Sequence, residues 1–301
     1  MLDISVVVPT YNRLDTLQHV VPTLLAQDVP PDRYEILVCD SNSTDGTAKY
    51  LARVAAQGGN VRHLPGAYGG RAAARNAGVA AALGRIVLFN DADILASPDL
   101  LARHLRRHQE RRHLAVVGLE VQVKNLEDYA YKRDRPEARG SLHPANRKRL
   151  SWLYFLTGNA SVEREDLLRV GSFDESFTGY GHEDLELGYR LERAGVEIVY
   201  EPQAVNYHCQ DVSVGDQKQK MKLAGRSTVR FYRKHPDFRV KLNLGMTPVS
   251  LGLHSILTHV PSLLGYFDAR AEGSKFARDL VWQYYYVSGI KEALSTHEND
   301  A

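Results

Sequence analysis

The first ninety residues alternate short apolar runs with longer amphipathic stretches, and this alternation restricts the chain to few fold classes. Strands alternating with helices form parallel sheets, and strands that are apolar on both sides have helices on both faces. We therefore predict an α/β protein with a Rossmann-like, mostly parallel sheet and helices on both faces. The predicted strands are 4–8, 35–39, 61–64 and 85–89, and the predicted helices are 14–27, 45–57 and 71–83.

Each predicted strand is followed by polar or small residues. These four segments are 9–12, 40–43, 66–70 and 90–93. The carboxyl ends of parallel strands meet at one edge of a sheet, where open α/β sheets bind ligands. We expect one binding site to be built from these segments.

Bulk composition excludes several classes of protein. With 301 residues, 44% hydrophobic and 25% charged, the chain can bury one large core or two smaller ones. Its 38 Lys and Arg against 36 Asp and Glu give no reason to expect nucleic acid as a partner. Cys39 and Cys209 have no metal or redox spacing, and the N-terminus lacks a signal-peptide pattern, so a cytoplasmic location is expected.

The remaining chain has a less regular pattern. We expect a helix over 97–113 capped by Ser97, a long loop covering the site over 123–149, and helices over 163–170 and 183–194. A strand over 197–200, the segment 205–208 and a basic helix over 215–235 follow. The apolar segment 242–267 is interrupted by prolines and polar residues, which favours helices packed on protein over helices lying peripherally on a membrane surface.

Asp91-Ala92-Asp93 directly follows the fourth apolar strand. Residues two apart in extended chain point the same way, so both carboxylates can converge on Mn²⁺ or Mg²⁺. An isolated D-x-D is common by chance, and the carboxylates could instead cap a helix and face solvent. The position of this one, at the expected ligand edge, favours the metal site.

The segment after the second strand and the glycine-rich segment after the third are the other candidate ligand contacts. Asp40 could accept a hydrogen bond from a nucleobase N–H, whereas Thr44 and Asp45 are explained as helix caps. Arg71 and Arg75 lie four apart on one face of the helix after Gly69-Gly70, which fits a ligand pair and a solvated pair equally well. No G-x-G-x-x-G and no phosphate-binding P-loop motif is present.

A second acidic cluster follows the glycines at 179 and 181. Glu183, Asp184 and Glu186 could simply complement a helix dipole, but the small residues before them let a substrate approach Glu183 and Asp184. A carboxylate there can act as a general base. His208 by itself is typical of a structural histidine.

Taken together, the segments 8–13, 40–47, 71–78, 91–93 and 179–191 resemble the family 2 glycosyltransferases, which are inverting enzymes with the GT-A fold. Residues 171–175 are similar to a segment shared with β-galactosyl- and N-acetylgalactosaminyltransferases. The resemblance covers about 4–208. It implies a nucleotide-sugar-binding half over 1–98, an acceptor-binding and catalytic half over 99–212, and a C-terminal helical extension over 213–301.

The resemblance also implies roles for individual residues. Asp184 aligns with the catalytic base and Glu183 with a residue that holds donor sugar or acceptor. Asp93 and His208 match metal ligands, with Asp91 near the ribose and metal. The residues in the nucleotide-binding positions are Pro9, Thr10, Tyr11, Asn12, Arg13, Asp40, Arg71, Arg75, Asp91 and Ala92. Those near donor sugar or acceptor are Trp152, Gly158, Asn159, Gly181 and His182.

The predicted reaction is metal-dependent transfer from a nucleotide diphosphate sugar, with a UDP-sugar expected, to a hydroxyl of a carbohydrate or glycoside. The absence of a Q-x-x-R-W signature and of clear spanning helices argues against synthesis of a long polymer. A sugar nucleotidyltransferase would need a basic, glycine-rich loop where 9–12 stands. A non-catalytic binding module on the same fold would not need Asp91, Asp93, Glu183 and Asp184.

Overall fold

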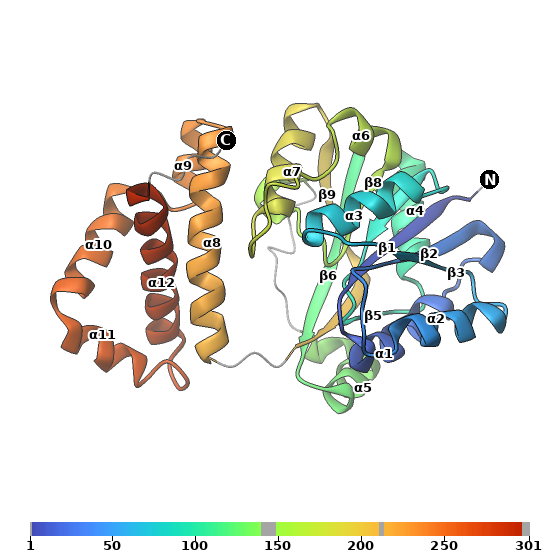
Figure 1. Cartoon of the computed structure of the whole chain (residues 1–301), viewed down its shortest axis with the longest axis horizontal. Helices are drawn as coiled ribbons and strands as arrows, with labels where there is room; N and C mark the ends of the chain where they lie inside the picture. Colours follow the sequence, from blue (N-terminus) through green and yellow to red (C-terminus); the bar gives the residue numbers. More distant parts are fainter. Residues whose placement is uncertain (1, 140–148, 211–213, 297–301) are drawn as a thin grey trace. The chain divides into compact units, whose positions relative to one another are not determined.

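The computed structural model describes residues 2–139, 149–210 and 214–296, and the chain forms two compact units (Figure 1). The first unit comprises Met1–Ser176 and Glu183–Asp211, and the second comprises Phe177–His182 and Val212–Ala301. The segment Phe177–His182 thus belongs to the helical unit, although the sequence analysis groups it with the catalytic half. No sequence pattern indicated that this segment leaves the first unit and returns to it at Glu183.

One nine-stranded sheet organises the first unit, in the order β3-β2-β1-β4-β8-β6-β9-β5, with β7 beside β9. Strands β1 to β4 pair in parallel, whereas β8 runs antiparallel between β4 and β6. The predicted parallel half is therefore confirmed, and the second half of the sheet is mixed. The strands are Ile4–Thr10 (β1), Tyr34–Asp40 (β2), Val61–Pro65 (β3), Ile86–Phe89 (β4), Ile94–Ala96 (β5), Leu114–Val123 (β6), Arg149–Leu150 (β7), Ala160–Glu163 (β8) and Glu197–Cys209 (β9).

Helices cover both faces of this sheet, as predicted. From β1 to β3 the chain moves outward, and α3 carries it back to β4, so right-handed crossovers place α3 on the face opposite α1 and α2. On the α3 face the fit is tight, because a Cβ on Gly78 would lie 2.4 Å from the Val7 side chain. The helices are Leu14–Leu25 (α1), Thr47–Ala56 (α2), Arg71–Ala81 (α3), Leu100–Glu110 (α4), Leu126–Asp134 (α5), Arg164–Arg169 (α6) and Glu183–Arg193 (α7).

Two local predictions are wrong. The loop expected over 123–149 contains α5, which buries no side chain but is capped by Asn125, whose side chain accepts a hydrogen bond from the Asp128 amide. Capping and an Asp128–Lys132 ion pair stabilise this helix, and its partly buried Tyr129 packs edge-on against Tyr207 of β9. Residues 140–148 of the expected loop lie outside the described residues. Helix α4 begins at Leu100 after the cap residue Asp99, not after Ser97, whose hydroxyl donates to Asp99.

The second unit is helical. Its helices are Val214–Lys234 (α8), Phe238–Asn243 (α9), Pro248–His259 (α10), Pro261–Asp268 (α11) and Lys275–Ser295 (α12). Helices α8 and α12 lie side by side (Figure 1) and approach so closely that a Cβ on Gly225 would lie 1.9 Å from the Tyr286 carbonyl oxygen. Across the part of the chain that the structure describes, we find no helix with the length and apolarity needed to cross a bilayer.

Two residues expected near the substrate belong to this unit. Gly181 has a φ of +89° and faces Ala224 of α8. The His182 ring lies 2.7 Å from the Thr228 hydroxyl oxygen, and burial lowers the pKa of His182 to about 4. His182 therefore contributes a neutral ring to the packing between the 177–182 segment and α8.

Candidate active site

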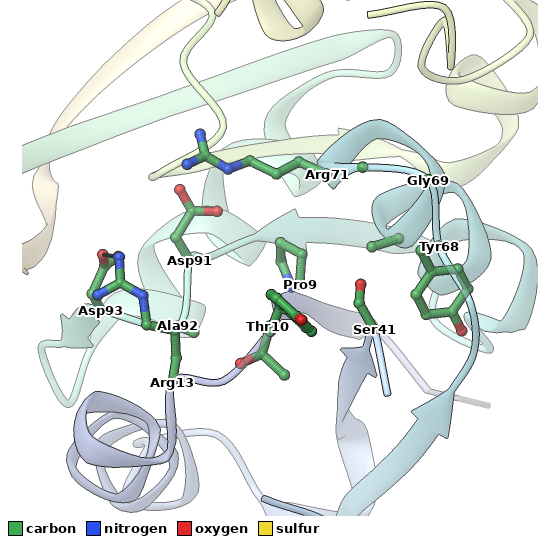
Figure 2. Close-up of a pocket in the computed structure, with 13 residues that line it drawn as sticks. Pro9, Thr10, Arg13, Ser41, Tyr68, Gly69, Arg71, Asp91, Ala92 and Asp93 are labelled. Atoms are coloured by element: carbon green, nitrogen blue, oxygen red, sulfur yellow. Dashed lines mark ion pairs between the residues drawn. The ribbon is translucent and has the colours of Figure 1, made fainter. Parts of the chain in front are cut away.

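The strand order reverses between β1 and β4, and a cavity of about 580 Å³ opens where these strands end (Figure 2). Such a reversal leaves a crevice because the loops after the two strands turn to opposite faces of the sheet. The segments after β1, β2, β3 and β4 all contribute, as the sequence predicted. The cavity is lined by Pro9, Thr10, Tyr11, Arg13, Ser41, Tyr68, Gly69, Gly70, Arg71, Ala74, Asp91, Ala92 and Asp93.

The middle of the cavity has an unsatisfied polar group. The Thr10 hydroxyl is buried and has no hydrogen-bond partner among the described residues, so it can bond to a ligand. Tyr68 and Ser41 lie on one side of Thr10 and Asp93 with Arg13 on the other (Figure 2). This gives the cavity an aromatic end and a charged end.

Two residues predicted to contact the nucleotide shape the cavity from behind. The Asn12 amide donates to the Ser43 hydroxyl, and the Asn12 side-chain oxygen accepts from the Thr44 amide. The Asp40 carboxylate accepts from the amide and hydroxyl of Ser43 and lies 3.0 Å from the His63 ring. Asn12 and Asp40 thus hold the loops after β1 and β2 together, while Thr10, Tyr11 and Ser41 line the cavity.

At the charged end, Asp93 faces His208 of β9. The His208 Nε2 atom lies 3.6 Å from Asp93 Oδ1, and the neighbouring Arg13 guanidinium lies 3.9 Å from Asp93 Oδ2. Burial disfavours charge on His208, but the Asp93 and Glu120 carboxylates outweigh it and raise the pKa of His208 to about 10. Burial likewise opposes the charge of Asp93, but His208 and Arg13 lower the pKa of its carboxyl.

Glu120 of β6 is a residue of this end that the sequence analysis missed. Its Oε1 atom lies 3.0 Å from His208 Nδ1, which leaves Nε2 directed at Asp93. A carboxylate on the outer nitrogen fixes the tautomer and orientation of a metal-binding histidine. Carboxylate oxygen and imidazole nitrogen form a donor set that suits Mn²⁺, so the residues present fit a divalent metal.

Gly158 is required by the position of Glu120. A Cβ on Gly158 would lie 2.0 Å from Glu120 Oε2 and 3.0 Å from the Ile94 side chain. Any side chain at position 158 would therefore push the Glu120 carboxylate away. Gly158, predicted to lie near the donor sugar, supports His208 through Glu120.

Arg75 joins the cavity to the second acidic cluster. Its buried guanidinium lies 2.8 Å from Asp91 Oδ1 and 3.1 Å from Glu183 Oε1, and it stacks over the Phe173 ring. Burial disfavours its charge, but Asp91 and Glu183 together raise the pKa of Arg75 further above its usual range. Arg75 thus fixes the first turn of α7 against the end of β4, whereas Arg71 lines the cavity itself.

Asp184 has the properties of a general base. Burial and the adjacent Glu183 carboxylate raise the pKa of Asp184 to about 7, while Arg75 opposes the rise. A base with a pKa near the operating pH combines an ionised state with enough basicity to accept a proton. Glu183 Oε2 is buried and has no partner among the described residues, so it can accept a hydrogen bond from a ligand hydroxyl.

Comparison with known proteins identifies the family. Residues 5–171 match the model described as glycosyl transferase family 2. The chain belongs to glycosyl transferase family 2. Residues 141–209 also match the model described as the N-terminal domain of galactosyltransferase, which confirms the similarity predicted around 171–175.

Several curated proteins resemble this family 2 chain. The validoxylamine A glucosyltransferase of Streptomyces hygroscopicus subsp. limoneus is 30% identical over 271 residues, covering 81% of this chain and 59% of the relative. The uncharacterized glycosyltransferase YfnE of Bacillus subtilis is 26% identical over 253 residues, covering 68% of this chain and 64% of the relative. The chain therefore spans about three fifths of the length of these relatives.

Solved structures confirm the GT-A fold. The mannosyltransferase PcManGT of Pyrobaculum calidifontis, solved in complex with GDP-Man and Mn²⁺, has a TM-score of 0.68 at 22% identity, covering 98% of this chain and 88% of that one. TarS 1–349 of S. aureus, solved in complex with UDP, has a TM-score of 0.56 at 19% identity, covering 97% and 89%. At these identities the likeness concerns the fold.

Two residues predicted near the donor sugar lie inside the family 2 domain. Trp152 is buried and its ring packs edge-on against Tyr189 of α7. The Asn159 amide donates to the Ala204 and Leu119 carbonyls, and its oxygen lies 2.9 Å from His104 Nε2. Both side chains hold β6, β8, β9 and α7 in place behind the site.

One further group of possible metal ligands lies at the opposite end of the sheet. His113, Glu163 and Asp166 cluster near the start of β4, because Glu163 pairs with Ile86. Arg85 and Arg112 bind Glu163, and Arg169 binds Asp166. These arginines already neutralise the carboxylates, so the cluster is explained as an ion-pair network.

Proposed function

We propose that the chain transfers a sugar from a nucleotide diphosphate donor to an acceptor hydroxyl with inversion at the anomeric carbon. The observation that carries the proposal is Asp184, a carboxylate with a pKa of about 7 at the start of a helix that Arg75 links to the nucleotide cavity. A general base placed beside a donor cavity suits direct attack by an acceptor hydroxyl.

In the proposed reaction the acceptor oxygen attacks the anomeric carbon from the side opposite the diphosphate. As the new carbon–oxygen bond forms, Asp184 takes the hydroxyl proton and the bond to the diphosphate oxygen breaks. One displacement of this kind inverts the anomeric configuration. Removing the base should cost about 10²–10⁴-fold in rate.

Glu183 has a positioning role in this scheme. Its Oε1 is held by Arg75, and its unpaired Oε2 is available to a hydroxyl of the donor sugar or the acceptor. Because Arg75 is almost fully buried, moving the Glu183 carboxylate away would break a buried ion pair and leave the cation with Asp91 alone. Glu183 therefore presents a fixed acceptor atom one residue before the base.

The residues proposed to hold a divalent metal are Asp93 and His208, with Asp91 on the ribose side. A bound cation would neutralise the charge that develops on the departing diphosphate. The mixed oxygen and nitrogen donor set favours Mn²⁺ over Mg²⁺. Mn²⁺ is also present in the solved complex of PcManGT, which supports the choice.

The proposed donor is a UDP-sugar. Tyr68 at the aromatic end of the cavity offers stacking surface to a base, Tyr11 is a second aromatic residue of the lining, and the Thr10 hydroxyl offers a hydrogen bond. TarS, of the same fold, was solved with UDP, whereas PcManGT was solved with GDP-Man. The expected acceptor is a carbohydrate or glycoside hydroxyl.

Release of UDP from a panel of UDP-sugars with Mn²⁺, with and without glycoside acceptors, tests the proposal. We expect Asp184→Asn to lose transfer by about 10²–10⁴-fold while its affinity for UDP stays unchanged. A parallel assay with GDP-sugars shows whether the donor carries uracil or guanine. Substantial transfer by Asp184→Asn, or a product with retained anomeric configuration by NMR, would refute the role given to Asp184.

A further inference from the structure

The second unit carries exposed apolar side chains at regular spacing. In α10, Val249, Leu253 and Ile256 are 80%, 38% and 57% exposed and follow one another by four and three residues. Positions at this spacing share one face of a helix. In α11 and just before it, the exposed Val260, Leu263 and Tyr266 continue the same spacing.

Val260 separates the two helices, so these six residues lie on two helix faces, which we together call the apolar stripe. The stripe stands in a part of the chain without charged residues. Residues 242–267 contain no Lys, Arg, Asp or Glu, although a quarter of the whole chain is charged. The side of α10 that carries His254 and Leu257 is buried, with His254 stacked on Tyr284 of α12. The stripe is therefore not the face that packs the unit's own core. An exposed apolar patch of this kind typically marks a site of interaction.

The residues around the stripe carry an excess of positive charge, which indicates the kind of surface that the stripe contacts. Residues 212–301 contain 13 Lys and Arg against 8 Asp and Glu, a surplus of five, while the surplus in the whole chain is two. At the ends of the stripe, Arg239 and Lys241 precede it and Arg270 follows it, with the Arg270 guanidinium 3.7 Å from the centre of the Tyr266 ring. An anionic surface complements this unit.

Two acidic residues near the stripe, Asp237 and Asp268, are engaged within the unit. Asp237 caps α9 by accepting from the Arg239 amide, and Asp268 pairs with Lys218 of α8. Basic residues at an apolar border beside an aromatic ring are typical of helices that lie at a lipid interface.

We propose that the apolar stripe on α10 and α11 inserts into the headgroup region of an anionic lipid bilayer. A second copy of the chain fits less well, because it would bring another basic unit against this one. Helices α10 and α11 are also short, at 12 and 8 residues, and neither can cross the bilayer. The inference concerns the helical unit and does not depend on the proposed transfer reaction.

Vesicle binding of the full chain tests the proposal. The probe is vesicles of phosphatidylcholine with roughly 30% phosphatidylglycerol, compared with pure phosphatidylcholine. We expect binding to the anionic vesicles that weakens in high salt. The double variant Val249→Ser/Ile256→Ser should lower the partition coefficient by about tenfold or more, because two exposed apolar side chains are lost.

Controls separate this outcome from misfolding and self-association. Leu83→Ser/Leu168→Ser removes two side chains of similar exposure, 63% and 48%, from the first unit and should bind as the unchanged protein does. Both double variants should keep the melting temperature. Equal vesicle binding by all three proteins would overturn the proposal, as would no binding at all. Sedimentation showing a dimer that Val249→Ser/Ile256→Ser dissociates would instead identify the stripe as a contact between copies.

Discussion

Asp184 should set the acid limb of the pH profile of transfer, and Glu183→Gln should move that limb to lower pH. The Glu183 carboxylate beside Asp184 is one of the two causes that raise the pKa of Asp184 to about 7 from its ordinary value of 3.8. The uncharged glutamine removes that cause. A lower pKa leaves Asp184 ionised in more acidic solution.

The size of the effect follows from the titration of one group. With a pKa of about 7, roughly one tenth of Asp184 is ionised at about pH 6, so kcat/KM should fall about tenfold per pH unit below the limb. In Glu183→Gln the plateau should drop, because Glu183 is also proposed to position substrate. The position of the limb, not the height of the plateau, is the measurement.

The assay is kcat/KM for UDP release between about pH 5 and about pH 9 at saturating metal. Glu186→Gln is the matched control, because Glu186 lies in the same first turn but pairs with Arg190 and is not among the main causes of the Asp184 shift. Its limb should stay in place. A Glu183→Gln limb that is unmoved or displaced upward would refute the assignment of Asp184 as the titrating base.

The raised pKa of Asp184 also affects stability. Rising pH ionises the base and increases activity, but it lowers the contribution of Asp184 to the free energy of unfolding. Because the pKa of Asp184 is higher in the folded state, the folded protein binds more protons between about pH 4 and about pH 7, and stability contributed through this group falls as pH rises. Asp184→Asn removes this loss. We expect the inactive variant to unfold at higher urea concentration than the parent at about pH 8, and an advantage that vanishes at about pH 4.

Three other predictions concern supporting residues. Glu120→Gln and Gly158→Ala should each weaken Mn²⁺ binding about 10–100-fold, measured by metal titration, since both release His208 from its orientation. Arg75→Met should lower the free energy of unfolding by about 3–5 kcal/mol in urea, because Asp91 and Glu183 lose their shared cation. Asn159→Ala should cost about 1–3 kcal/mol without changing UDP affinity, since it leaves the Ala204 and Leu119 carbonyls unpaired; weakened UDP binding would contradict this structural role.

Local patterns were sufficient to predict which strand ends line the cavity. The strands β1, β2 and β4 are buried and mostly apolar, and polar residues stand at their ends or directly after them. One-dimensional spacing therefore already places Thr10, Ser41 and Asp91 at a common edge. The register of the parallel pairs, with Thr10 opposite Asp40, realises this arrangement. Residues that stand directly at the end of a strand can therefore be placed at the cavity from their position in the sequence.

Pairing between distant strands made the rest unpredictable. Glu120 lies inside β6 with no local signal, and it reaches His208 only because β6 and β9 pair with Gln122 opposite His208. The role of Arg75 likewise depends on α3 and α7 meeting, 108 residues apart in the chain. Helix α5 was missed for a different reason, since it buries no side chain and leaves no apolar period to detect.

The support for a metal site at Asp91-Ala92-Asp93 depends on three other residues, Glu120, His208 and Gly158. A D-x-D triplet at a strand end gives one or two carboxylates, which alone can cap a helix as readily as bind a cation. His208, in contrast, has a carboxylate near each ring nitrogen, Asp93 at 3.6 Å and Glu120 at 3.0 Å. Bringing three partly buried titratable groups together costs desolvation free energy. Capping does not require that gathering, and neither does it require a glycine at 158 to leave room for Glu120. The case for a metal at Asp93 therefore rests more on the residues behind His208 than on the triplet itself.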